Sequence, residues 1–282
     1  FLILRTSFIF EYSPEILNIL MVWGALTAFF SAFIGCFQLD IKKIIAYSTC
    51  SQLGYMFSVC GLSGYNFSLF HLINHAFFKA LLFLSAGMLI HSLLNEQDIR
   101  KMGSLLKLLP VTFCFFFLGS LALMGLPFFS GFYSKDLIIE LFFIQLNFSS
   151  IFSYWLLIFS ALLTIIYSLR LIYFVFLNKK NFHKNFFHKT IYTKIQESNF
   201  FLILPLIGLA FGSIFSGYFL QDLIVGQGSE FFRHCLYILP KKELYTQVEH
   251  TPFFFKQLPI YFSIFGYFIL LNFFLVLNKK HN

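Results

Sequence analysis

The segment LALMGLPFFSGFYSKDLIIELFF, residues 121–143, places a lysine and two carboxylates inside an otherwise apolar run. It belongs to a longer segment, residues 104–145, that is too long for one straight helix, because about 20 residues span the core of a bilayer. Gly125, Pro127 and Gly131 weaken helical continuity in its middle. We therefore predict a discontinuous helix over 104–145, with two half-helices flanking the interruption.

The composition of the whole chain is that of a membrane protein. Of its 282 residues, 59% are hydrophobic and 11% are charged, whereas soluble domains carry roughly 25% charged residues. Such a chain cannot cover itself with an ordinary water-facing surface. We predict an all-α polytopic membrane protein with about eight membrane-crossing units, and we place apolar spans at 16–37, 41–62, 66–92, 104–145, 150–177, 199–222 and 258–277.

The basic residues give the predicted spans a direction. Of the 20 Lys and Arg residues, 12 lie in loops that alternate to one side of the membrane, five lie on the other side and three lie inside spans. Basic loops mark the inner side of a membrane, so we expect the C-terminus and the basic 178–198 loop on that side. Residues 1–15 read as the tail of a preceding helix with its loop, and residues 199–282 as two further spans with an intervening loop.

Net charge and cysteines exclude several function classes. The charge of +8 is spread between apolar spans rather than gathered on one face, so we expect membrane lipids and no nucleic acid as partners. The five cysteines form no CxxC pair or other metal-ligand spacing. We expect no metal, no bound cofactor and no redox chemistry in this chain.

The stretch HLINHAFFKALLF, residues 71–83, is the first candidate site. His71, His75 and Lys79 recur every four residues, so on a helix they form one polar stripe about 12 Å long. Histidine exchanges protons near neutral pH, and ionisable groups at membrane depth usually mark ion or proton paths. We interpret the stripe as part of a proton path. The alternative is two packing histidines and a lysine that extends to the membrane surface.

The second candidate site is Lys135 with Asp136, directly after the predicted interruption. A broken helix leaves backbone groups and dipole ends at membrane depth, which is tolerated where they line a cavity or an ion site. Glu140 lies one turn beyond Asp136 and can join the site. The alternative is a loop lysine at the membrane surface, but apolar residues on both sides argue against it.

A third set of polar residues is a weaker candidate. Hydroxyls and lysines at the start of the 41–62 span can hold waters in a channel, or they can simply make interfacial and interhelical hydrogen bonds. Arg170 either takes part in the path, pairs with a carboxylate or approaches the inner surface. The members of this set are Lys42, Lys43, Ser48, Thr49, Ser51 and Arg170.

At these residues the chain resembles a known family. The segments DIKKIIAYSTCSQLGYMF (40–57), HLINHAFFKALLFLSAGMLIHSLLNEQDIRKMGSL (71–105) and GSLALMGLPFFSGFYSKDLIIE (119–140) are similar to the antiporter-like subunit 5 family of mitochondrial NADH:ubiquinone oxidoreductase, respiratory complex I. GSIFSGYFLQDLIVGQGSEFF (212–232) resembles the later part of the same family. The segment around Lys135 is the most specific of the four.

The resemblance implies a fold and a function. It implies that residues 16–177 are the second of two inverted five-helix repeats, with Lys135 as the lysine of a proton half-channel and Asp136 as its neighbour. His71, His75 and Lys79 then match the central hydrophilic axis of the family. The chain would be a membrane subunit of the H⁺-translocating NADH:ubiquinone reductase in the mitochondrial inner membrane, with the C-terminus in the matrix. FMN, iron–sulfur clusters and quinone are expected in other subunits.

The departures from the family leave alternatives open. The first repeat and the lateral helix of longer relatives are missing here, so we expect the rest of subunit 5 on other chains, beside subunit 4. One alternative is a subunit of a related monovalent-cation/proton antiporter or of the plastid relative of complex I. Another is a structural membrane subunit without transport.

Overall fold

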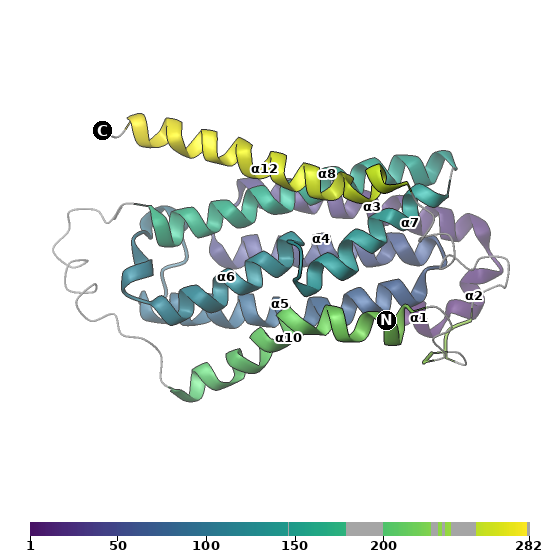
Figure 1. Ribbon diagram of the computed structural model, residues 1–282, viewed down its shortest axis with the longest axis horizontal. Coiled ribbons are helices and arrows are strands. Elements are labelled where there is room, and N and C mark those ends of the chain that lie inside the picture. Colours follow the sequence, from purple (N-terminus) through teal and green to yellow (C-terminus); the bar gives the residue numbers. More distant parts are fainter. Residues whose placement is uncertain (146, 179–199, 227–230, 233–234, 238–251, 281–282) are drawn as a thin grey trace.

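The protein is a bundle of long helices that run along one common axis (Figure 1). The computed structural model describes residues 1–145, 147–178, 200–226, 231–232, 235–237 and 252–280. Its elements are α1 (Leu2–Arg5), α2 (Ser7–Glu11), α3 (Pro14–Phe37), α4 (Ile41–Gly61), α5 (Tyr65–Ser92), η1 (Ile99–Lys101), η2 (Leu105–Lys107), α6 (Pro110–Met124), η3 (Phe132–Asp136), α7 (Leu137–Ile144), α8 (Phe148–Ile172), η4 (Tyr173–Leu177), α10 (Phe200–Ile224) and α12 (Phe253–Lys280).

The predicted all-α membrane fold is confirmed. With α6, η3 and α7 counted together, the described residues contain seven long helical units, close to the predicted number. Four of these helices are long and apolar enough to cross a membrane by themselves: α3, α5, α8 with η4, and α10. Large apolar side chains cover their outer faces, as lipid contact requires, including Phe30, Phe33, Phe211, Phe215 and Phe219. The predicted basic loop lies outside the described residues beyond Asn178.

The discontinuous helix is confirmed, and its backbone explains the interruption. Helix α6 ends at Gly125, whose φ of +77° is left-handed and therefore suits glycine. Pro127 follows, and Phe128 also has a positive φ of 73°. The chain becomes helical again in η3, a π-helical turn that continues directly into α7. Figure 1 shows α6 and α7 as two half-helices in one line across the bundle.

The first half-helix begins later than predicted. It starts at Pro110, a residue favoured at the first position of a helix. Residues 99–107 instead form the two short 3₁₀ turns η1 and η2, separated by Ser104 in a left-handed conformation with a φ of 58°. The span at membrane depth is therefore α6 to α7, and the segment before it is a surface loop.

Two of the loops that the basic-residue pattern places on one side do meet. The loop before α4 and the loop before η1 join in an antiparallel bridge between Asp40 and Asp98. Arg100 binds Asp98 through its guanidinium at 2.7 Å and through its backbone N–H at 2.9 Å. The Arg100 side chain holds the pKa of Asp98 below its ordinary value. The loops thus fix the same end of α3, α4 and α5.

Helices α3 and α4 pack at backbone distance. A Cβ added to Gly54 on α4 would lie 2.5 Å from the amide nitrogen and 2.8 Å from the Cα of Ala28 on α3. Gly24 on α3 lies equally close to the backbone of Ser58 on α4. Small residues permit this approach, which drives helix association in membranes through van der Waals contact. Ser51 adds a hydrogen bond from α4 to the Ala28 carbonyl at 3.0 Å.

We predict that Gly54→Leu separates α3 from α4, so that most copies of the chain no longer assemble into their native complex. Overpacking typically costs about 1–3 kcal/mol, and here the obstacle is backbone that cannot rotate away. The measurement is the amount of chain in the complex on native gels. Gly87→Leu is the control, because no described atom outside its own helix lies within 4 Å of a Cβ there. Equal loss for both variants would contradict the packing argument.

Candidate functional site

Lys135 lies in the middle of the bundle, in the π-helical turn after the interruption. Its side chain is 1% exposed, and its Nζ donates a hydrogen bond to Thr164 Oγ1 of α8 at 2.9 Å. The ammonium also lies 5.5 Å from the centre of the Tyr55 ring on α4, which is within cation–π range. Asp136 is the next residue, is also buried, and acts on Lys135 electrostatically. Two neighbouring ionisable side chains are therefore buried where the membrane is otherwise apolar.

The interruption places these two side chains beside the end of a helix. The position that a Cβ of Gly125 would take lies 3.8 Å from both Asp136 Oδ1 and Lys135 Cδ. Gly125 ends α6, and the last carbonyls of a helix carry the negative end of its dipole. The break therefore brings a partial negative charge to the aliphatic stem of Lys135. A continuous helix would keep its carbonyls bonded internally.

His71 connects this pair to α4. The ring is fully buried, with Nδ1 2.9 Å from Ser134 Oγ in η3 and Nε2 3.1 Å from Gln52 Oε1 in α4. Because the Gln52 oxygen only accepts, Nε2 of a neutral ring donates to it, and Nδ1 and the Ser130 carbonyl, 3.2 Å from Ser134 Oγ, are then the two acceptors for the one Ser134 hydrogen. Ser134 directly precedes Lys135. The histidine of α5 is thus one side chain away from the buried lysine.

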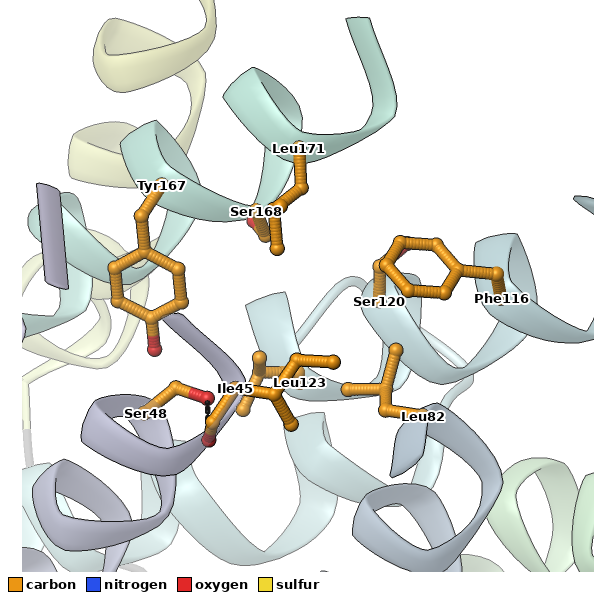
Figure 2. Close-up of a pocket in the computed structure, with 9 residues that line it drawn as sticks. All are labelled: Ile45, Ser48, Leu82, Phe116, Ser120, Leu123, Tyr167, Ser168 and Leu171. Carbon is orange, nitrogen blue, oxygen red and sulfur yellow. Dashed lines mark hydrogen bonds between the residues drawn. The ribbon is translucent and has the colours of Figure 1, made fainter. Parts of the chain in front are cut away.

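Lys79 binds the same helix one turn away from Gln52. The side chain is 4% exposed, and its Nζ donates a short hydrogen bond to Ser48 Oγ. Ser48 in turn donates to the Ile45 carbonyl at 2.7 Å, the bond drawn in Figure 2. Ser48 and Gln52 are four residues apart, so they share one face of α4. Helix α4 therefore holds the partners of both Lys79 and His71.

The predicted stripe is only partly continuous. His75 is half-buried, and its Nε2 has no hydrogen-bond partner within the described part of the chain. Its ring centre lies 6.2 Å from that of His71 and packs edge-on against Phe78. His75 therefore does not link Lys79 to His71. Each of these two side chains instead hydrogen-bonds a residue of α4.

Of the weaker candidates, Ser48 belongs to this chain of contacts, and the others lie away from it. Lys42 and Lys43 are exposed at the start of α4, where Lys43 pairs with Asp40 at 3.0 Å. Thr49 donates to the backbone of its own helix, and Ser51 joins α4 to α3. Arg170 donates to the carbonyls of Cys36 and Gln38, so it binds the C-terminal end of α3. Among the predicted alternatives for Arg170, its position matches an interfacial contact.

Glu140 stays close to the second candidate site. It is half-buried on α7, one turn after Asp136, and both carboxylates are close enough to interact. Lys256 of α12 acts on Glu140 electrostatically. These contacts extend the polar region from Asp136 toward the end of the bundle where α7 meets α12, seen at the right of Figure 1.

Several contributors were not identified from the sequence. Thr164 and Tyr55 contact Lys135 directly, and Ser216 of α10 donates to the buried Asn74 Oδ1 of α5 at 2.7 Å. A usable signal for Thr164 was its position four residues after Ser160 on an otherwise apolar helix. The described residues contain no group of three His, Cys, Asp or Glu side chains placed to hold a metal ion.

The arrangement is suited to moving protons. Two lysines, a histidine and a carboxylate lie buried at membrane depth, and each lysine and the histidine has a hydroxyl or amide group at hydrogen-bond distance. Such groups exchange protons through hydrogen bonds, whereas a charge this deep is costly without a function.

The comparisons with known proteins agree with this geometry. Residues 1–170 match the family model "NADH:quinone oxidoreductase/Mrp antiporter, TM", and residues 167–282 match "NADH dehydrogenase subunit 5 C-terminus". The chain is 51% identical over 274 residues to NADH-ubiquinone oxidoreductase chain 5 of Chondrus crispus, covering 95% of this chain and 40% of that protein. It is 48% identical over 284 residues to the chain 5 of Rhizopus stolonifer, covering 100% and 42%.

A solved structure has the same fold. The Mrp complex from Dietzia sp. DQ12-45-1b matches with a TM-score of 0.71 at 22% identity, over 93% of this chain and 28% of that one. The chain thus spans about two fifths of the length of the curated relatives it matches. The resemblance to subunit 5 that the sequence motifs indicate is confirmed. The chain belongs to the NADH:quinone oxidoreductase/Mrp antiporter transmembrane family.

Proposed function

We propose that this chain is a proton-translocating part of the membrane arm of an NADH:ubiquinone oxidoreductase, equivalent to the later part of chain 5. The observation that carries the proposal is the buried Lys135–Asp136 pair at the helix break, with its links through Ser134 to His71 and Gln52. The similarity to chain 5 proteins over nearly the whole chain supports the same reading.

The chemistry follows from the positions of the charges. Asp136 favours the charged form of Lys135, and the aromatic face of Tyr55 supports the same form. A change in the charge of Asp136 shifts this balance and allows Lys135 to release or take up a proton. The hydroxyl of Thr164 is the hydrogen-bond neighbour through which that proton leaves or arrives, and Ser134, the residue before Lys135, hydrogen-bonds His71.

The proposal also includes the membrane in which the chain lies, its orientation there and its partner subunits. We place the chain in the mitochondrial inner membrane with its C-terminus in the matrix, because the basic loops lie on that side in the sequence pattern. Its partners are other membrane-arm subunits, subunit 4 among them, and the region of chain 5 that this chain does not span. FMN, iron–sulfur clusters and quinone belong to other subunits, whose redox energy drives the transport.

We predict that Lys135→Met lowers the rate of proton pumping by about 10²-fold, the lower end of what positioned acid–base groups contribute. Methionine keeps the length of the side chain but removes the exchangeable proton. The measurement is NADH-driven proton uptake into vesicles that contain the assembled native complex. Lys101→Met is the matched control, because Lys101 pairs with Glu96 on an exposed loop at 3.2 Å.

Other outcomes separate the alternatives. Normal pumping by an assembled Lys135→Met complex would contradict the proposal and favour a structural subunit. Pumping that depends on sodium or potassium in the medium would instead favour monovalent-cation/proton antiport.

We also predict unequal effects for the two histidines. His71→Phe removes both contacts to Ser134 and Gln52 and lowers pumping by about tenfold or more, whereas His75→Phe changes it by less than about twofold. The same replacement at both positions keeps side-chain volume matched. Pumping and the amount of assembled complex are measured together. A larger pumping defect for His75→Phe would show that the path follows α5 alone and does not pass through α4.

A further inference from the structure

A small cavity lies directly beside the Lys79 site, between α4, α5, α6 and α8 (Figure 2). Its volume is about 10 Å³, which is close to the least that can hold one water molecule. Most of its lining is apolar, but three serines and one tyrosine also reach it: Ser48, Ser120, Ser168 and Tyr167. One wall of this cavity is therefore the serine that binds Lys79.

The hydroxyl of Tyr167 is the exceptional group in this wall. The side chain is 1% exposed, and within the described residues its hydroxyl makes no hydrogen bond. Figure 2 shows the ring pointing its hydroxyl toward Ser48. The hydroxyl is close enough to act on Ser48 and Gln52, although neither contact has the geometry of a hydrogen bond. A buried hydroxyl without a partner costs roughly 1–3 kcal/mol, so its position calls for a ligand.

Two other hydroxyls of the cavity, those of Ser120 and Ser168, donate to backbone carbonyls of their own helices and can accept from a ligand in the cavity. Ser120 donates to the Phe117 carbonyl at 2.7 Å, and Ser168 donates to the Thr164 carbonyl at 2.7 Å. Each serine oxygen keeps a lone pair for a further donor. A water in the cavity would thus find a donor in Tyr167 and acceptors in the serines, within the two to four polar partners that buried waters have.

The hydrogen-bonded contacts of Lys79 and those of His71 are not joined to each other, and the gap between them lies beside this cavity. The hydrogen bond of Lys79 leads to Ser48, and that of His71 leads to Gln52, one turn further along α4. The Nε2 of Gln52 also has no partner among the described residues. Tyr167 approaches both residues from α8. One tyrosine hydroxyl and one water are enough to connect the two sets of contacts.

We infer that Tyr167 positions a water molecule in this cavity and that this water receives the proton of Lys79 through Ser48. The inference rests on the proposed function. In the step, an N–H bond of the Lys79 ammonium breaks and an O–H bond forms on Ser48. The original Ser48 proton, turned from the Ile45 carbonyl toward the cavity, passes to the water. Tyr167 donates to the water before the transfer. Afterwards Lys79 is neutral, Ser48 keeps one proton, and the oxygens of Ser120 and Ser168 accept from the protonated water.

The test is Tyr167→Phe in the assembled native complex, because this change removes the hydroxyl and keeps the packing of the ring. We expect proton pumping to fall by about tenfold and its solvent deuterium isotope effect to rise, since a positioned proton-transfer step becomes slower. Tyr154→Phe is the matched control: Tyr154 lies on the same helix, is buried, and has a hydroxyl without a partner in the described residues, but it faces another cluster.

A second variant separates the water from the packing. Ser120→Val fills the cavity from α6 with apolar atoms, so we expect the same loss of pumping. The double variant should lose no more than either single variant, because both remove the same water. If Tyr167→Phe fails to assemble, Ser120→Val decides by the same two readouts.

Two results would overturn the inference: unchanged pumping in assembled Tyr167→Phe, or losses in the two variants that simply add. Lys135→Met is measured in parallel to separate this inference from the proposed function. Normal pumping with Lys135→Met would overturn the proposed function itself. Lost pumping with Lys135→Met but normal pumping with Tyr167→Phe would overturn only the role of Tyr167.

Discussion

The structure depends on one constraint: a polar group inside the apolar layer of a membrane must find its partner within the protein. Two lysines, a histidine and a carboxylate lie buried here, and each lysine has a hydroxyl at hydrogen-bond distance. These hydroxyls come from α4 and α8, whereas the lysines come from α5 and η3. Satisfying the charges therefore also fixes how four helical segments pack against one another.

Helix α4 organises this interior. Its glycines and Ser51 hold it against α3 at backbone distance, and the adjoining face carries Ser48, Gln52 and Tyr55. That face binds Lys79 and His71 and presents the Tyr55 ring to Lys135. A helix fixed so closely on one face cannot move away from the charges beside the adjoining face. The break in α6–η3–α7 places Lys135 near this face of α4.

Much of the fold and the main charges of the site could be predicted from the sequence. Apolar runs of membrane length gave the spans, and Gly125 and Pro127 gave the interruption, because hydrophobicity and helix breaking act locally. Lys79, His71 and Lys135 stood out because a charge among apolar residues is visible in one dimension. The connections between them were not predictable. Whether the polar path leads from His71 to His75 or to Gln52 depends on how α4 and α5 are rotated against each other. Helix packing decides that rotation.

The hydrogen bond of Ser48 to the Ile45 carbonyl has a consequence for timing. A hydroxyl turns about a single bond, whereas shifts of helices or of a broken helix move many residues together and take microseconds to milliseconds. Within one slow movement of the backbone, the hydroxyl can turn many times and so reaches its own equilibrium. It can pass protons but cannot set their direction. Under the proposed function, the direction of proton movement therefore depends on slower elements, and the α6–η3–α7 segment beside Lys135 is where the helical backbone is interrupted.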